Sequence, residues 1–344
     1  MELGGSLIST DLLRIARRAA HSAVALGRIF VLKQRVPLFV LWNVTFRCNL
    51  RCRYCGACDV RQEELDTAGV LRGLDDLWAL GARWITFGGG EPLLRPDMGE
   101  IMAHARKLGF EPFLSTNGWL IPRCMDVVRL ASHVNLSLDG PRAIHDEVRG
   151  EGAFDHTLDA ARACRDAGVP VSFQCTLSSM NLQCVDDVVA LAGSLNVPIM
   201  FQPATAWLEP SVQPNPIAPE RDAYRSAINR LIELKRGGRP VSNSVAGLRH
   251  LMCWPDNTSV WCSAGKIMAV VEPDGRLLAC HQCDFARTAA ENDGGAAAFI
   301  REQFARTPAL PGCAQCWCGP LVELAMLFSM QSGAVSGALR RFFE

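Results

Sequence analysis

With 344 residues, the chain is long enough for one large catalytic domain and a smaller unit beside it. Its 35 Lys and Arg side chains balance 35 Asp and Glu, so nothing in the bulk charge calls for nucleic acid or another polyanion as a partner. Fifteen cysteines without a cleavable signal sequence favour metal-bound thiolates in a reducing cytoplasm over a disulfide framework.

The first predicted element is a basic amphipathic helix over residues 11–32, where apolar side chains recur at helical spacing beside four arginines. Charged side chains keep this segment below the roughly 18 uninterrupted apolar residues that a membrane-spanning helix needs. Two interpretations stay open: the helix caps one end of a barrel, or it makes a peripheral contact with a membrane. The apolar run 321–330, followed by Arg340, Arg341, Phe342 and Phe343, poses the same choice.

From residue 38 onward, short apolar runs alternate with segments of helical period, which predicts six βα units and a parallel sheet. The expected strands are 38–44, 84–87, 111–115, 134–138, 170–177 and 198–202. The expected helices lie near 66–80, 97–108, 122–131, 153–167, 182–194 and 219–236. Reactive groups of such sheets gather at the carboxyl ends of the strands, so the active face is expected there.

A second unit is expected after the sixth helix, because Gly237, Gly238 and Pro240 mark a boundary. Its clearest element is a hairpin with strands 267–272 and 276–279 around Pro273-Asp274-Gly275, a strong turn signal. A cysteine-rich segment and a terminal helix follow.

Three cysteines on one loop directly follow the first strand: Cys48, Cys52 and Cys55, spaced CxxxCxxC. Three thiolates at this spacing can bind three irons of a 4Fe-4S cubane and leave the fourth iron without a protein ligand. Such an open iron can chelate the amino and carboxylate groups of a methionine moiety. The alternatives are a zinc loop, with Cys58 as the fourth ligand, or incidental buried thiols.

With Tyr54 before the third cysteine, this loop resembles that of the radical S-adenosylmethionine (SAM) superfamily. Gly89-Gly90-Glu91-Pro92 after the second strand resembles the family's GGEP motif, which implies that Gly89, Gly90 and Glu91 hold the SAM amino group. The resemblance implies a partial (β/α)6 TIM-like barrel and an enzyme that cleaves SAM to a 5′-deoxyadenosyl radical.

Three further segments resemble motifs of radical SAM enzymes with cysteine-rich C-terminal extensions: Ser115–Gly118, Ser137–Gly140 and His145–Gly150. By that resemblance Tyr54, Ser137 and Arg149 contact SAM. The weaker pocket candidates are Asn117, Asn181 and Gln202. The plainer alternatives are a turn at Asp139, a capping or surface role for His145 and a solvated charge at Arg149.

A second set of cysteines surrounds the predicted hairpin and resembles the twitch domain, a shortened relative of the SPASM extension. That resemblance implies one auxiliary 4Fe-4S cluster held by Cys262, Cys280, Cys313 and Cys316. The pairs Cys280/Cys283 and Cys313/Cys316 alternatively have the CxxC spacing of a zinc ribbon. Cys283 and Cys318 are candidates for extra ligands of the cluster. Functional roles for Cys58 and Cys253 are open, and the remaining cysteines are expected to be small buried hydrophobic residues.

The sequence thus predicts four parts: an N-terminal helical extension (1–37), a radical SAM core (38–236), an auxiliary-cluster domain (237–320) and a C-terminal helix (321–344). The expected reaction is hydrogen abstraction for oxidation or bond formation on a small natural-product intermediate, with a flavodoxin- or ferredoxin-type electron donor. A peptide maturase and a lipid- or isoprenoid-modifying enzyme are the alternatives. A non-catalytic iron-sulfur or zinc protein is the alternative from another class.

Overall fold

Six parallel strands form the central sheet of the computed structural model, which describes residues 23–208, 213–256, 258, 260–280, 300–307 and 316–329. The strands pair in chain order from β1 to β6, so each βα unit adds the next strand. The fold class expected from the sequence is confirmed, as is the position of each strand to within about two residues. The strands are β1 (Phe39–Thr45), β2 (Trp84–Gly89), β3 (Glu111–Thr116), β4 (His133–Ser137), β5 (Val171–Leu177) and β6 (Ile199–Pro203).

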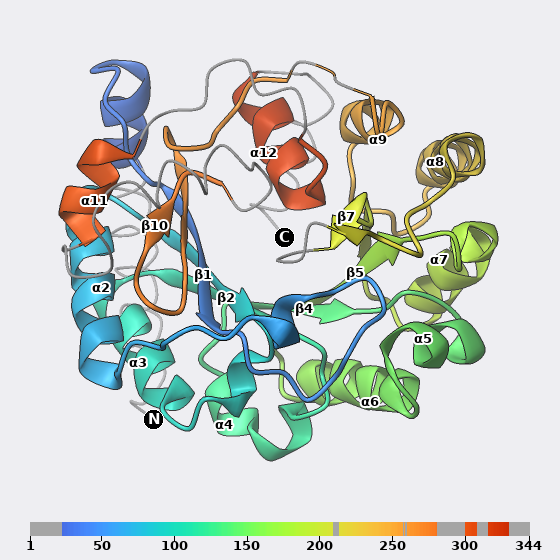
Figure 1. Ribbon diagram of the computed structural model, residues 1–344, viewed down its shortest axis with the longest axis horizontal. Helices are drawn as coiled ribbons and strands as arrows, with labels where there is room; N and C mark the ends of the chain where they lie inside the picture. Colours follow the sequence, from blue (N-terminus) through green and yellow to red (C-terminus); the bar gives the residue numbers. More distant parts are fainter. Residues whose placement is uncertain are drawn as a thin grey trace, which may run out of the picture.

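Helices cover the outer face of this curved sheet (Figure 1). Five of the six expected helices are present as predicted, but the helix expected at 122–131 is only η3 (Ile121–Arg123) followed by the single turn α4. Pro122 suits the first turn of a short helix, and the non-helical backbone at Cys124 separates the two pieces. The helices are α2 (Thr67–Leu80), α3 (Met98–Leu108), α4 (Met125–Val128), α6 (Ala153–Asp166), α7 (Val185–Ser194) and α8 (Arg221–Arg236).

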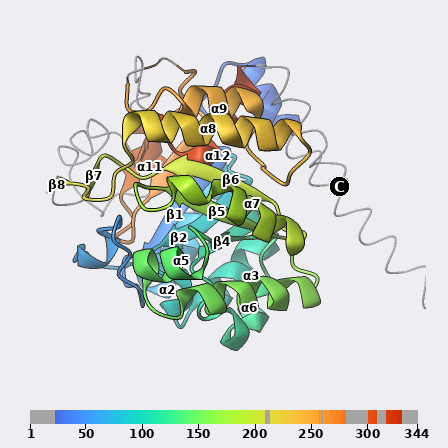
Figure 2. The same ribbon diagram turned by 90° about the vertical axis from the view of Figure 1, so that its right-hand side faces the viewer.

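The sequence did not predict α5 (Arg142–Arg149), because its apolar side chains are too few to show a helical period. Four other short strands and α-helices of the described chain were also missed. Two of them, β7 (Trp207–Leu208) and β8 (Gln213–Pro214), pair as a small ribbon. The others are α9 (Val245–Leu251), which packs beside α8 (Figure 2), and α11 (Ile300–Arg306), which packs on α2.

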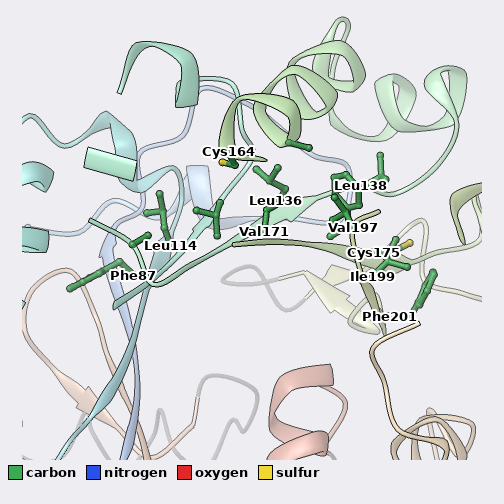
Figure 3. Packing of buried hydrophobic residues seen from close by; sticks show 14 of the residues in the cluster. Phe87, Leu114, Leu136, Leu138, Cys164, Val171, Cys175, Val197, Ile199 and Phe201 are labelled. Atoms are coloured by element: carbon green, nitrogen blue, oxygen red, sulfur yellow. The ribbon is translucent and has the colours of Figure 1, made fainter. Parts of the chain in front are cut away.

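Alternating residues of each strand divide the sheet into two chemically different faces. On β1, Val40, Trp42 and Val44 are buried toward the helices, whereas Phe39, Leu41 and Asn43 are only partly covered. The outward side chains of the later strands build the main core between sheet and helices, and Figure 3 shows that cluster. The other face, called the inner face here, carries both apolar and polar side chains.

The predicted hairpin extends the same sheet. Its strands are β9 (Met268–Val271) and β10 (Leu277–Leu278), and β9 runs parallel to β1, opposite β2. The turn at Gly275 lies where the sequence placed it, with a positive φ of 86° that favours glycine. The sheet therefore continues across the boundary expected at residue 237, and the division into domains stays a prediction.

Helix α12 (Gly319–Phe328) lies across the side of the barrel that the sheet leaves open between β6 and β10 (Figures 1 and 2). Its Leu321 and Leu324 pack on the inner side chains Met268 and Val270 of β9. At its first residue, the backbone N–H of Gly319 donates to Gln202 Oε1 of β6 at 3.1 Å. The helix thus bridges both edges of the open sheet.

The predicted terminal helices are described only in part. Residues 23–30 are helical, as the sequence predicted, whereas residues 11–22 and Arg340, Arg341, Phe342 and Phe343 lie outside the described residues. Among the helices that the structure describes, none combines the length and apolar character needed to cross a membrane.

Gly73 of α2 tests how tightly the outer layer packs. A Cβ atom at this position would lie 2.5 Å from the ring of Trp42 and 2.9 Å from Ile300 Cδ1, so Gly73→Ala overpacks the contact between β1 and α2. We expect a loss of about 1 to 3 kcal/mol in the free energy of unfolding, measured by urea denaturation. Gly27→Ala is the control, because nothing lies within 4 Å of its Cβ position. Equal stability of the two variants would contradict the packing argument.

Candidate active site

The loop after β1 has its base fixed by a polar network. Glu64 accepts hydrogen bonds from Arg47 Nε (3.0 Å) and Nη2 (2.9 Å) and from the Thr45 hydroxyl. Arg95, which is buried, lies 3.8 Å from the same carboxylate and donates to the Val44 carbonyl at 3.0 Å. These contacts fix the direction in which the chain leaves the strand.

The thiols of Cys48, Cys52 and Cys55 lie close enough to influence one another. Burial raises the pKa of each thiol, to about 11 for Cys55, and the neighbouring sulfurs, Cys58 included, raise it further. Metal binding must therefore displace protons from this group. Across the described residues, no group of three His, Cys, Asp or Glu side chains is arranged to hold a single metal ion.

Three hydrogen-bond donors point at the sulfurs of this loop. The N–H of Leu50 lies 3.5 Å from Cys48 Sγ, Asn117 Nδ2 lies 4.0 Å from the same sulfur, and Arg149 Nη1 lies 3.8 Å from Cys52 Sγ. Donors of this kind stabilise thiolate charge. The mutual proximity of the sulfurs and these donors fit a cysteine-ligated cluster, with Cys48, Cys52 and Cys55 as the residues that would hold it.

Gly89 and Gly90 allow the loop after β2 to contact the cysteine loop through backbone atoms. The N–H of Gly90 donates to the Thr45 carbonyl at 2.7 Å, and the N–H of Glu91 donates to the Arg47 carbonyl at 2.8 Å. A Cβ at Gly89 or Gly90 would lie 2.2 or 2.3 Å from those carbonyl oxygens, and Gly89 has a φ of 109°. Only glycine fits this approach.

The Glu91 carboxylate joins the loop after β2 to the end of β3. Both its oxygens lie 2.9 Å from the Thr116 hydroxyl, and they accept further hydrogen bonds from the N–H groups of Leu93 and Asn117. Burial raises its pKa to about 7, against the opposing effect of these donors. The protein itself therefore supplies its hydrogen bonds, and the contact to SAM expected for Glu91 stays a prediction.

A buried ion pair connects the cysteine loop with the ends of β4 and α5. Arg149 Nε lies 2.6 Å from Asp139 Oδ2, the Tyr54 hydroxyl donates to the same oxygen at 2.8 Å, and Arg149 also donates to Tyr54. Asp139 is fully buried and Arg149 is 8% exposed, so the interpretation of Arg149 as a solvated charge was wrong. Sequence reasoning missed Asp139 as the centre of the group, although the spacing of the motifs placed it at a strand end.

Asn181 and His145 complete this network from two sides. Asn181 Nδ2 donates to the carbonyls of Asp139 (2.7 Å) and Thr176 (2.9 Å), which makes it a support of the site. His145 is fully buried, and its Nδ1 accepts the Asp139 N–H at 3.0 Å. Burial lowers the pKa of His145 to about 4, and its Nε2 has no partner within the described parts of the chain. His145 is thus neutral, and the surface interpretation was wrong.

The inner face of the sheet is polar but carries few charges. Along β1–β6 and β9, no inner position is Lys or Arg. Amides and hydroxyls gather toward the carboxyl ends of the strands, whereas apolar side chains such as Phe39, Leu41 and Trp84 lie toward the amino-terminal ends. In the register of the inner face, Asn43 pairs with Gly88, and Ser115 pairs with Asn135. Asn135 also pairs with Ser172, and Ser137 pairs with Gln174, so polar side chains of β3, β4 and β5 lie side by side.

Glu272 stands at the carboxyl end of β9 and is the acidic member of this inner face nearest the cysteine loop. Asn43 Nδ2 donates to its Oε1 at 3.1 Å, which places the carboxylate beside β1 on the inner side. Glu272 is 9% exposed, and burial raises its pKa despite Asn43 and the more distant Arg276. Sequence reasoning did not select it, because it reads as an ordinary residue before a turn.

The second cysteine set is only partly described. Cys262 and Cys280 pack together against Ala264 and Ala279 near the base of the hairpin. Cys316 precedes α12 and lies beside α9, where His250 Nε2 is 2.9 Å from the Cys316 carbonyl oxygen. Cys283 and Cys313 lie outside the described residues, so the predicted ligand set stays a prediction.

The remaining cysteine candidates have different surroundings. Cys58 Sγ accepts from Arg51 Nη1 at 3.8 Å, beside the first cysteine set. Cys253 donates to the carbonyl of Arg249 one turn earlier, at 3.7 Å. Cys318 begins α12, and burial raises the pKa of its thiol to about 11.

The sequence profile described as "Radical SAM superfamily" matches residues 42–192. Together with the six-stranded fold, the cysteine loop and the glycine loop beside it, this match identifies residues 42–192 as a radical SAM domain.

Among curated relatives, "Fe-coproporphyrin III synthase" of Methanosarcina barkeri is 38% identical over 174 residues, which cover 48% of this chain and 43% of the relative. "PqqA peptide cyclase" of Xanthomonas oryzae pv. oryzae is 37% identical over 164 residues, covering 45% and 44%. The matches thus span less than half the length of these relatives.

Two solved structures share the fold at low sequence identity. SuiB of Streptococcus suis bound to its precursor peptide SuiA superposes with a TM-score of 0.64 at 13% identity, over 83% of this chain and 68% of that one. The anSMEcpe structure with bound AdoMet gives 0.62 at 20% identity, over 79% and 80%. At these identities the likeness concerns the fold alone.

The buried His145 predicts a specific dependence of stability on pH. In the unfolded chain His145 is protonated below its ordinary pKa of 6.5, whereas in the folded chain its pKa is about 4. The free energy of unfolding therefore falls as the pH is lowered from 6.5 to 4. His145→Asn keeps an acceptor for the Asp139 N–H and removes the titration. Between about pH 7 and pH 5 the variant should lose about 2 kcal/mol less unfolding free energy than the parent in urea. His104→Asn on α3 is the control, and parallel pH profiles of parent and His145→Asn would exclude the assignment.

Proposed function

We propose that the chain reductively cleaves SAM and abstracts a hydrogen atom from a small polar molecule, leading to its oxidation or to bond formation. The observation that carries the proposal is the placement of Cys48, Cys52 and Cys55 beside the backbone loop of Gly89 and Gly90, at the end of a polar inner face. The cluster and SAM, when bound, would supply the 5′-deoxyadenosyl radical.

The roles proposed for the surrounding residues follow from their contacts. Gly89 and Gly90 leave room for backbone contacts to the SAM amino group, and Glu91 holds that loop against β3. Tyr54 and Arg149 fix the loop around Cys52, with Asp139 as their shared acceptor. Ser137 and Asn117 offer polar groups at the ends of the next strands. A flavodoxin- or ferredoxin-type protein is the proposed electron donor.

The inner face supports a substrate rich in hydrogen-bond donors. Its amides, hydroxyls and the Glu272 carboxylate accept such donors, whereas a polycarboxylate would meet no Lys or Arg on the inner positions of β1–β6 and β9. This charge pattern favours a small hydroxyl- or amine-bearing molecule. A peptide is the second candidate, because relatives of this chain include a peptide cyclase and SuiB was solved with a precursor peptide. A lipid or isoprenoid is the third, since the inner face is polar.

One auxiliary 4Fe-4S cluster is proposed on Cys262, Cys280, Cys313 and Cys316. The packing of both Cys262 and Cys280 on the same two alanines, Ala264 and Ala279, supports it. A cluster with four protein ligands would accept an electron from the substrate radical, which suits a net oxidation. Gln202 is then best explained as a support of α12, since its Oε1 accepts the Gly319 N–H.

Anaerobic reconstitution with iron and sulfide tests both cluster proposals. We expect about eight irons per chain and release of 5′-deoxyadenosine from SAM after reduction with dithionite, because two cubanes would be bound. Cys52→Ala should abolish SAM cleavage and leave about four irons, whereas Cys262→Ala should lower the iron content while SAM cleavage persists. Cys164→Ala, in the buried core of α6, is the control. About four irons and one zinc per chain would refute the auxiliary cluster. If SAM were not cleaved under a strong reductant, the enzyme proposal would fail and a non-catalytic iron-sulfur protein would be the better explanation.

Replacing Glu272 with Gln tests whether its carboxylate serves the substrate site or stabilises the fold. Because burial raises its pKa, the ionised form costs stability at neutral pH, and Glu272→Gln should unfold at the same temperature as the parent or at a higher one. Below the ordinary pKa of 4.5 this difference should vanish, since the parent carboxyl is then protonated in both states. Scanning calorimetry at the two pH values gives the comparison. A marked loss of stability at neutral pH would make Glu272 a structural partner of Asn43 and withdraw it from the substrate site.

A further inference from the structure

Exposed apolar side chains concentrate in one short segment far from the cysteine loop. Six large hydrophobic residues of the described chain are strongly exposed, and five of them lie between residues 24 and 32. Val31 and Leu32 are the most exposed, at 77% and 62%. They follow the helical residues 23–30, drawn in dark blue in Figure 1, and form what we call the apolar tip, residues Val24, Leu26, Phe30, Val31 and Leu32.

The apolar tip is held in a fixed position by the body of the protein. Ala25 is buried with Val36, Leu38 and Ile267, so one side of the helical residues packs on the barrel. The Phe30 ring stacks on Phe328 of α12 with centroids 5.6 Å apart, and Phe328 stacks on Trp261 at 5.7 Å. The side chains of the apolar tip are therefore exposed although the segment that carries them is anchored to the barrel.

Backbone and arginine contacts fix the turn behind the tip. The N–H of Val31 donates to the Gly27 carbonyl at 2.9 Å, and Lys33 turns the chain with a φ of 53°. Arg28 Nη1 donates to the Leu80 carbonyl at the end of α2, and Arg35 Nε donates to the Gly265 carbonyl. Each of these arginines therefore keeps its positive charge beside the tip without pairing with a carboxylate of the described residues.

The stretch of chain that carries the apolar tip has charges of one sign. Between Asp11 and Asp59 the sequence contains nine Lys and Arg residues and no Asp or Glu. Within the described part of that stretch, Lys33 is exposed directly after Leu32, and Arg28 and Arg35 flank the turn. A second lysine, Lys266, lies over the Trp261 ring of the same aromatic stack, 5.7 Å from its centroid. Exposed apolar side chains with cationic side chains beside them fit the surface of a lipid bilayer, where acyl chains lie below anionic headgroups.

We propose that the apolar tip docks the protein onto a lipid bilayer that carries anionic headgroups. Five side chains are far fewer than the roughly 20 residues that each partner contributes to a stable protein interface, so a second copy of the chain is a poorer occupant. The tip lies by the amino-terminal ends of β1 and β2, where Phe39 stacks on Trp84 and meets Phe328 edge to face. The cysteine loop lies at the opposite, carboxyl end of β1, so docking leaves that face open.

Vesicle sedimentation of the reconstituted full chain tests this proposal. The probes are vesicles of phosphatidylcholine alone and vesicles with about one third phosphatidylglycerol. We expect binding to the second kind, weakened by high salt, and a loss of about tenfold or more in the partition coefficient for the double variant Val31→Asp/Leu32→Asp. Lys33→Glu should weaken binding to a smaller degree.

Trp207→Asp is the matched control, because Trp207 is 54% exposed but lies on β7, away from the tip. Its vesicle binding should equal that of the parent. SAM cleavage by the double variant reports that it is folded and loaded, so failure of docking and failure of the proposed function are separate results. No binding of the parent to anionic vesicles, or equal binding by the double variant, would overturn the proposal. A dimer of the parent that the double variant dissociates would assign the tip to a second copy and also overturn it.

Discussion

The buried ion pair of Arg149 and Asp139 is the interaction on which the arrangement of the active face depends. It joins three segments that are distant in sequence: the cysteine loop through Tyr54, the end of β4 through Asp139, and α5 through Arg149. Removing two charges from water costs several kcal/mol per ion unless hydrogen bonds saturate them. Here Asp139 Oδ1 also accepts the Thr176 N–H at 2.8 Å, so β5 shares in the compensation.

A buried ion pair whose hydrogen bonds are satisfied in this way fixes the relative positions of the segments it joins more than it stabilises the fold. An apolar replacement of the same volume could fill the space, but it could not orient a donor toward Cys52 Sγ. The Glu91 carboxylate does the same for the glycine loop, since its partners come from β3 and from its own loop. Both buried acids thus hold loops whose backbones must keep a fixed distance, while the apolar core behind them fixes the strands.

The sequence predicted the strands and most helices because their two-residue and helical periods reflect burial on one face. It also located the cysteine and glycine loops, whose residue types are fixed by chemistry that few other structures require. The partnership of Asp139 with Arg149 was not predictable, since it depends on how α5 folds back toward β4, and α5 lacks an apolar period. Glu272 was missed for a similar reason: its inner position follows from β9 pairing with β1, a contact between residues more than 200 positions apart.

That pairing also explains how an open sheet can enclose a reactive site. A sheet of six parallel strands leaves two edges, and unpaired edges admit water. Here β9 covers the edge at β1, and α12 spans from β9 to β6, with Leu321 and Leu324 filling the inner face at the amino-terminal end. Apolar side chains thus close the floor of the barrel, whereas amides, hydroxyls and Glu272 line the part nearer the cysteines. The chain can therefore exclude solvent below the site and still offer directional hydrogen bonds to a polar molecule above it.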